Sequence, residues 1–206
     1  MFRRLTLSAT LGALIFVASC AETKIEEEAP DAQAAPAEEG PFYELTKDEV
    51  TSHPDWTSKN ITFKGLKIGD RGPAIDKALG KGEKTDNVSP EHYRTAYDKS
   101  SFAIYTFKMT SELQKIEIYS KTADQIADPK FKKLLSSGDL KFMREAFGME
   151  EKSEQNFNTT GMEYIYDEKG FRFVQYNLGG QPVNALLFSK IAKKAAAPEE
   201  AKTETK

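Results

Sequence analysis

Six short segments of the chain are mainly hydrophobic and have the length and pattern of β-strands. The segments are rich in aromatic and β-branched residues and are bounded by turn-forming residues, as hairpin-connected strands are. The pattern predicts two groups of three strands, over 92–97, 102–108 and 114–121 and again over 162–166, 171–176 and 184–190.

Helical signals precede each group of strands. Pro73 suits the first position of a helix and Gly80 supplies its stop, whereas residues 140–147 lie between Asp139, a capping residue, and Gly148. One further helix is expected before each of these two. The capping-box pattern Thr46-Lys47-Asp48-Glu49 begins the first, and Asp128-Pro129 opens residues 130–136 as the second.

Self-comparison indicates an internal repeat. The segment 97–102 (YDKSSF) recurs as 166–171 (YDEKGF), 118–121 matches 187–190 in the same register, and 75–80 matches 143–148 one residue out of register. Chance matching among common strand and turn residues is the alternative. The predicted fold is α+β, a tandem repeat of helix, helix and antiparallel meander with the helices packed on one face of the sheet. The domain is expected over 41–190, with copies at about 46–121 and 128–190.

The start of the chain has the pattern of a secretory signal. Arg3 and Arg4 precede an uncharged, mainly apolar run over residues 5–19. That run is shorter than the roughly 20 residues that a helix needs to cross a bilayer. We therefore expect residues 1–19 to be a cleaved signal peptide rather than a permanent membrane span.

The end of this signal, Val17-Ala18-Ser19-Cys20, resembles the lipobox of bacterial lipoproteins. The resemblance implies that Cys20, the one cysteine of the chain, carries diacylglycerol and an acylated amine, with palmitate-type chains holding the protein to a membrane. Several acyl chains give a stable anchor. Ala21 in place of aspartate favours the periplasmic side of the outer membrane if the cell is Gram-negative. The alternative is an ordinary signal followed by a chance cysteine.

Two flanking segments cannot build a core. Residues 20–40 are rich in alanine, proline and glutamate and hold seven acidic residues against one lysine, so an extended tether is expected. Residues 191–206 have similar composition and are expected to be a disordered tail. With the chain at −3 overall, the charges of these two segments and of the signal peptide leave 41–190 near neutral. A neutral domain without a basic stripe argues against nucleic acid as a partner.

The first half of the domain resembles the SmpA/OmlA group of outer-membrane-assembly lipoproteins. The resemblance rests on Gly65-Leu66-Lys67-Ile68-Gly69-Asp70, the helix ending Leu79-Gly80, and the strands within 93–97 and 102–118. One departure is Lys81-Gly82-Glu83, where the family usually has proline. The resemblance implies a beta-lactamase inhibitor protein-like fold and a non-catalytic, protein-binding lipoprotein of the cell envelope.

Catalytic and metal-binding patterns are missing from the sequence. His53 and His92 are its two histidines, and with Cys20 used for lipid no Cys/His metal set or nucleophile pair remains. Asp124, Asp128 and Asp139 lack the spacing of a calcium loop. We expect no catalytic residue, no cofactor, no metal and no enzyme activity. An enzyme that uses His92 beside a carboxylate is a third hypothesis, besides protein binding and ligand binding.

Strand alternation assigns an aromatic set to the sheet face that the helices leave open. Aromatic residues mixed with arginine are typical of protein interfaces. A rival hypothesis is a carrier of a small ligand or lipid, with a cavity between sheet and helices lined by Phe171, Phe173 and Leu187. Alternatively, the preceding segment, with Phe42, Tyr43 and Trp56, covers the face. The expected partner-binding residues are Arg94, Tyr105, Phe107, Glu117, Tyr119, Arg172, Tyr176 and Phe188.

Overall fold

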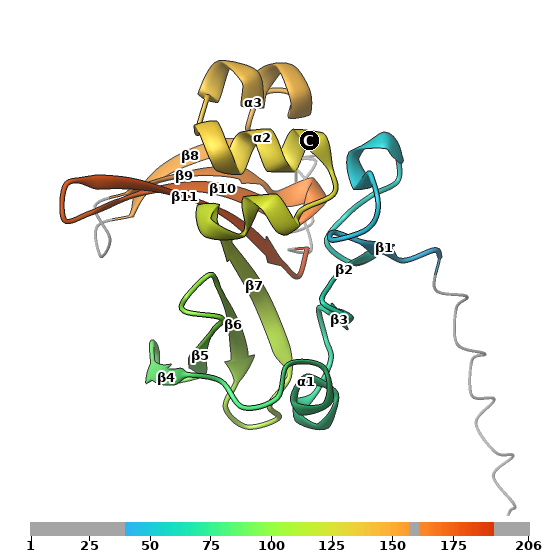
Figure 1. Cartoon of the computed structure of the whole chain (residues 1–206), viewed down its shortest axis with the longest axis vertical. Helices are drawn as coiled ribbons and strands as arrows, with labels where there is room; N and C mark the ends of the chain where they lie inside the picture. Colours follow the sequence, from blue (N-terminus) through green and yellow to red (C-terminus); the bar gives the residue numbers. More distant parts are fainter. Residues whose placement is uncertain (1–39, 157–160, 192–206) are drawn as a thin grey trace, which may run out of the picture. The chain divides into compact units, whose positions relative to one another are not determined.

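An eight-stranded antiparallel sheet organises the computed structural model, which describes residues 40–156 and 161–191 (Figure 1). The strand order is β4-β5-β6-β7-β11-β10-β9-β8, so two four-stranded meanders meet at its centre. The strands are β4 (Lys84–Asn87), β5 (His92–Tyr97), β6 (Phe102–Phe107), β7 (Leu113–Tyr119), β8 (Lys152–Asn156), β9 (Gly161–Tyr166), β10 (Phe171–Leu178) and β11 (Gln181–Ser189).

The central pair of strands, β7 and β11, sets the register between the two meanders. Ile116 lies opposite Phe188, and Glu117 lies opposite Leu187. Because side chains alternate along a strand, Ile116 and Phe188 point to one face of the sheet while Glu117 and Leu187 point to the other.

One face of the sheet is covered by helices and by a second, three-stranded sheet, ordered β1-β2-β3. Figure 1 shows α2 and α3 over the β8–β11 half, and α1 and the small sheet beside the β4–β7 half. The covering elements are β1 (Tyr43–Glu44), η1 (Val50–Ser52), β2 (Ile61–Phe63), β3 (Leu66–Lys67), α1 (Gly72–Leu79), η2 (Ser120–Gln125), α2 (Pro129–Ser137) and α3 (Leu140–Phe147); η3 (Asp167–Lys169) joins β9 to β10.

The main core lies between these elements and the sheet. Phe63 of the small sheet meets Phe102 of β6 edge to face, at 5.2 Å between ring centroids. Phe131 of α2 contacts Phe171 at 5.4 Å and Phe188 at 5.6 Å. Since all five rings are almost fully buried, burial of aromatic surface is a main source of stability on this side.

The predicted tandem repeat of helix, helix and meander with helices on one sheet face is wrong. The six predicted strands and the helices α1, α2 and α3 are present, but no helix starts at Thr46. The Asp48 carboxylate accepts the amide N–H of Glu44 at 2.6 Å, and Glu44 accepts the Thr46 hydroxyl at 3.0 Å. These side-chain bonds close a turn, which competes with the capping box, and only the 3-10 turn η1 follows.

Two outer strands also escape the sequence pattern and make the fold richer in sheet than predicted. The first, β4, has the sequence Lys-Thr-Asp-Asn, and β8 has Lys-Ser-Glu-Gln-Asn. Both lie at the edges of the large sheet, where a strand needs no apolar face and charged residues discourage further pairing. An alternation of apolar and polar positions is therefore absent from them, and the pattern that reveals the inner strands fails.

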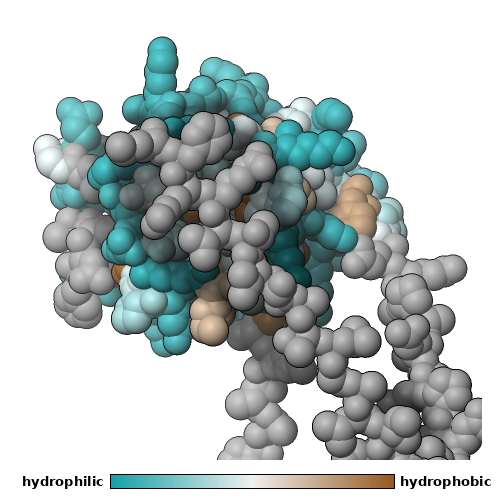
Figure 2. Space-filling model, turned by 90° about the horizontal axis from the view of Figure 1, so that it is seen from below, coloured by the Kyte–Doolittle hydropathy of each residue, from teal (hydrophilic) through white to brown (hydrophobic). Residues whose placement is uncertain are grey.

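Several predictions lie outside the described residues, namely the signal peptide, the lipidated Cys20, the tether up to residue 39 and the tail from residue 192. Within the described ranges, no helix is long and apolar enough to cross a membrane. Figure 2 shows a mainly hydrophilic surface with small, separate apolar patches among the coloured residues.

Candidate functional site: a tyrosine-lined groove over a buried glutamate

The face of the large sheet opposite the main core, called the open face below, carries its own side-chain cluster. Val174, Ala185 and Leu187 are buried there, and Tyr105, Tyr119 and Tyr176 pack against them. The tyrosines come from β6, β7 and β10, and thus from both meanders. Residues far apart in sequence meet here because β7 and β11 pair at the centre of the sheet.

Glu117 of β7 lies at the middle of this cluster and is only 1% exposed. Its Oε2 accepts the hydroxyl protons of Tyr105, at 2.8 Å, and of Tyr119, at 2.6 Å. Its Oε1 accepts the hydroxyl of Tyr176. A buried carboxylate is tolerated only when its lone pairs are occupied, and three tyrosine donors meet that requirement here.

Arg94 of β5 supplies the positive charge nearest this carboxylate. Its Nε lies 3.6 Å from Glu117 Oε2, and its Nη2 donates to the Tyr119 hydroxyl at 2.8 Å. The Tyr119 hydroxyl thus accepts from Arg94 and donates to Glu117. This relay fixes the orientation of Arg94, Tyr119 and Glu117.

The tyrosines of the cluster are proton donors and hold their protons. Burial, followed by the negative charge of Glu117, raises the pKa of Tyr105, Tyr119 and Tyr176 far above the usual value for a phenol. A tyrosinate nucleophile or base is therefore disfavoured at neutral pH. Because Glu117 already accepts hydrogen bonds from three tyrosine hydroxyls, the arrangement suits binding better than proton transfer.

A groove of about 810 Å³ opens above the cluster. Its lining comes from strands and connecting turns of the large sheet, and it combines aromatic and aliphatic walls with charged groups. That combination, with a few fixed polar groups in an apolar surface, is typical of binding sites. The lining residues are Val88, Arg94, Ser100, Tyr105, Lys115, Glu117, Tyr119, Ser120, Lys121, Glu163, Tyr176, Val183 and Leu187.

The structure brings five of the eight predicted interface residues together in this groove. They are Arg94, Tyr105, Glu117, Tyr119 and Tyr176.

The other three predicted residues lie elsewhere. Arg172 is on the same face but outside the lining, where its Nη1 donates to Glu163 Oε2 at 3.0 Å. Phe107 stands beside His92 at 5.7 Å between ring centroids. Phe188 does not belong to the open face: it is 1% exposed and packs in the main core.

The error at Phe188 has a physical reason. Ala185-Leu186-Leu187-Phe188 is apolar throughout, so the sequence has no alternation that assigns sides. The pairing of Phe188 with Ile116 sets the phase instead, and it places Leu187 in the groove. The sequence reading also missed Lys115, Lys121 and Val183, and it treated Glu117 as a surface residue. A lone acid between two isoleucines, followed by tyrosine, was the available signal.

The alternative cover for the open face does not apply to the described residues. Tyr43 and Trp56 pack in the main core, and Phe42 is 40% exposed beneath the Lys67 ammonium, 4.6 Å from it. The groove therefore stays open along the described chain.

The histidines belong to other surroundings. His92 Nδ1 lies 3.1 Å from the Ser89 hydroxyl, and the ring of His53 stacks on Tyr43 at 4.0 Å between centroids. Among the residues that the structure covers, no group of three or more histidine, cysteine or acidic side chains is arranged to hold a metal ion.

The cavity on the helical side is much smaller than the groove. It measures about 200 Å³ and is lined by Trp56, Phe147, Tyr166 and Phe171 among others. Phe173 is fully buried, and Leu187 faces the groove instead. Pockets for small organic ligands usually measure about 300–1,000 Å³, so this cavity is below that range.

Comparison with known proteins gives two distant likenesses. No family model and no curated protein matches the chain. A solved DUF4309 family protein, YjgB from Bacillus subtilis, is 14% identical over 62% of this chain and 84% of its own, with a TM-score of 0.42. An extracellular protein containing an SCP domain from Bacillus anthracis is 6% identical over 59% of this chain and 43% of its own, with a TM-score of 0.37. At these scores neither likeness carries an argument about fold or function.

Proposed function

We propose that the chain is an exported, lipid-anchored binding protein and that the groove on its open face holds a segment of a partner protein. The observation that carries this proposal is the set of three tyrosines and Arg94 fixed over the buried Glu117 in the floor of that groove. Tyrosine and arginine are the residue types that most often dominate the energy of protein interfaces.

Preorganisation supports binding as the role of the cluster. A partner that meets freely rotating side chains loses about 0.5–1.5 kcal/mol for each one it immobilises. In the groove, Tyr105, Tyr119 and Tyr176 are already held by Glu117, so less of that loss is incurred on binding. The chain then needs no catalytic group, in keeping with the protonated state of these tyrosines.

A small-molecule ligand is the second candidate function, and the volume of the groove favours it. At about 810 Å³ the groove is large enough for a small organic ligand. It is, however, open along one side and extends over both meanders, from Val88 to Val183. A surface of that extent suits a chain segment better than a molecule that needs to be enclosed.

In this proposal Cys20 determines where in the cell the domain can meet a partner. Lipid on Cys20 would hold the domain near a membrane through the acidic segment that follows, and would restrict it to partners in the cell envelope. Cys20→Ser is expected to move the folded protein from the membrane fraction to the soluble fraction. A variant that stays with the membrane would contradict lipid anchoring and leave the groove proposal untouched.

The binding role is tested by crosslinking in intact cells, followed by identification of the attached protein and a binding measurement with that protein purified. Tyr105→Ala with Tyr176→Ala should abolish the crosslink. Val183→Arg, which places a bulky charge across from Tyr176 but keeps every side chain that bonds Glu117, should do the same. Met149→Arg, at a position 71% exposed just after α3, is the matched control and should leave it intact. Unchanged crosslinks in both groove variants would refute the proposal.

A further inference from the structure

The carboxylates of the groove are already matched by cations. Glu117 has Arg94 at 3.6 Å in addition to its three tyrosine donors. Glu163 accepts from Arg172 at 3.0 Å. Neither carboxylate therefore offers a strong site for a cationic ligand, since an incoming cation would have to displace an existing partner.

Two lysines of the groove lack such partners. Within the described part of the chain, neither Lys115 nor Lys121 has a carboxylate at ion-pair distance. The Lys115 ammonium lies 5.8 Å from the centroid of the Tyr105 ring and is near enough to Glu163 and Glu117 to feel their charge, but it is not paired with either. After the paired charges cancel, the groove is left with two positive charges and their unused N–H donors.

The spacing of these lysines indicates the shape of what would meet them. Lys115 lies within β7 and Lys121 just beyond its end, six residues further along. At about 3.3 Å per residue, the four strand steps from Lys115 to Tyr119 alone cover roughly 13 Å, and Lys121 follows in η2. One small anion cannot contact both ammonium groups, whereas an extended chain segment can.

The surface between the two lysines is apolar and aromatic. On β7 the buried Glu117 and Tyr119 lie between them on the same face, and Leu187 lies opposite Glu117. Tyr176, whose ring centroid is 6.3 Å from that of Tyr119, and Val183 line the groove beside this stretch. A segment that fits has negative charge near both ends and apolar or aromatic side chains between them.

From this charge pattern we propose that the partner segment in the groove is an extended acidic peptide, with one carboxylate on Lys115 and another on Lys121. The inference rests on the proposed binding function and adds the chemistry of the partner to it.

The surroundings of Lys115 favour an incoming carboxylate. Burial, followed by the positive charge of Arg172, lowers the pKa of the Lys115 ammonium. Glu163 and Glu117 act in the opposite direction but do not outweigh these two effects, and a negative group placed beside the ammonium would oppose them further. Complementary charges of this kind also speed association and suppress unsuitable partners.

The test uses the whole chain from residue 20 with Cys20→Ser and a blocked seven-residue peptide as probe. The peptide has glutamate at both ends and valine, serine and tyrosine between them, so that its carboxylates are six residues apart. Matched peptides carry glutamine or lysine at both ends. Calorimetry should detect binding of the acidic peptide, at least tenfold weaker binding of the glutamine peptide, and none of the lysine peptide.

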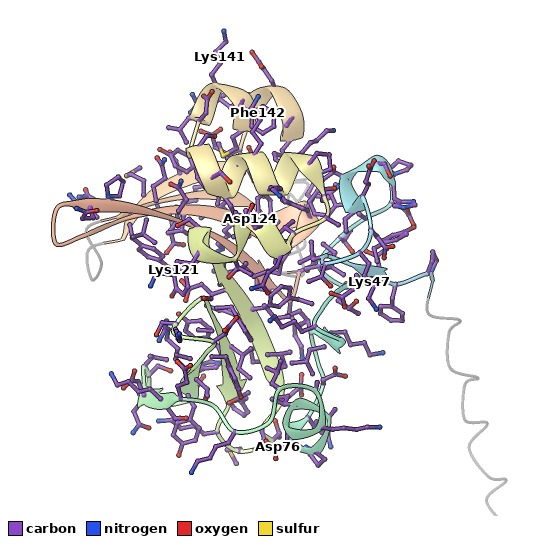
Figure 3. All side chains as sticks on the ribbon, in the orientation of Figure 1. Lys47, Asp76, Lys121, Asp124, Lys141 and Phe142 are labelled. Atoms are coloured by element: carbon purple, nitrogen blue, oxygen red, sulfur yellow. The ribbon has the colours of Figure 1, made fainter. Side chains whose placement is uncertain are left out.

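Substitutions locate the contacts. Lys115→Gln and Lys121→Gln should each lower the affinity for the acidic peptide about three- to fivefold. Added salt should also lower this affinity. Lys141→Gln is the control, because Lys141 projects from α3 at the top of Figure 3, well away from Lys121. Unchanged affinity in both groove variants would overturn the inference.

The remaining outcomes separate this inference from the proposed function. Equal binding of the acidic and glutamine peptides would overturn the acidic partner and leave the groove as a protein-binding site. If no peptide binds but Val183→Arg still abolishes the cellular crosslinks, the acidic partner is likewise overturned and the groove remains a protein-binding site. Binding of no peptide with crosslinks unaffected by Val183→Arg would refute both. Binding of a single-stranded oligonucleotide in place of the peptide would also overturn the inference.

Discussion

Replacing Glu117 with leucine removes the acceptor on which three tyrosine hydroxyls and Arg94 converge. Breaking a buried ion pair by removing one partner costs about 3–5 kcal/mol, because the remaining polar groups are left unsatisfied. The tyrosine rings are only half-buried, so water from the groove can reach part of the released hydroxyls. We therefore expect the lower end, about 3 kcal/mol less free energy of unfolding.

The loss is measured by urea unfolding with the fluorescence of Trp56, the one tryptophan of the chain and a residue of the main core. In a thermal scan it corresponds to a fall in Tm of roughly 6–12 °C for a domain of this size. Glu117→Gln retains one carbonyl acceptor and should cost about 1–2 kcal/mol. Glu163→Gln, which breaks an ion pair whose arginine is 30% exposed, is the control and should cost less than about 1 kcal/mol.

A double-mutant cycle separates orphaned donors from lost packing. Tyr105→Phe combined with Tyr176→Phe removes two of the three hydroxyls that Glu117→Leu leaves without an acceptor. The combined variant should then be about 1–2 kcal/mol more stable than the sum of the separate changes predicts. If Glu117→Leu is as stable as the wild type, or if the changes simply add, the account of the cluster as a mutually satisfied polar network is refuted.

Other parts of the domain give sharper checks on the fold. Asp128→Ala should cost about 2–4 kcal/mol, because its buried carboxylate caps α2 and also accepts the amide and hydroxyl of Thr51, at 2.6 and 2.7 Å. Asp139→Ala removes an exposed cap of α3 and should cost about 1 kcal/mol; equal losses in urea unfolding would contradict this. Burial alone would raise the pKa of Glu44, but hydrogen bonds from Gly65 N–H and nearby hydroxyls outweigh it and lower the pKa. The ionised Glu44 therefore stabilises the fold above the ordinary carboxyl pKa of about 4.3, and this contribution is lost as pH falls through the lowered pKa. The difference in unfolding free energy between the wild type and Glu44→Gln should shrink in acid. A difference that stays constant with pH would contradict this prediction.

Much of the secondary structure is predictable because the inner strands and helices carry the expected patterns. The strands around Phe102 and Phe171 alternate, and α3 lies between a capping aspartate and Gly148 as predicted. The first predicted helix is missing because Asp48 and Glu44 satisfy local backbone groups in a turn. Such side-chain bonds compete with helix formation and do not show in a capping pattern.

The candidate site is predictable only in part, for a related reason. The period-two alternation of side chains along a strand correctly places Tyr105 and Tyr176 on one face. It cannot assign the uniformly apolar β11, where pairing with β7 decides that Leu187 faces the groove. The burial of Glu117 depends on three tyrosines from three strands meeting in space, and the local pattern Ile116-Glu117-Ile118-Tyr119 shows only one of them.

The most direct test of the groove as the binding surface is photo-crosslinking in intact cells from single positions. A photoreactive residue at Val183, in the groove, is compared with one at Met149, in the loop after α3. The account predicts a defined protein crosslink from position 183 that disappears with Tyr105→Ala and Tyr176→Ala, and none from position 149. A crosslink from position 149 alone, or one from 183 that the tyrosine substitutions leave unchanged, would contradict it.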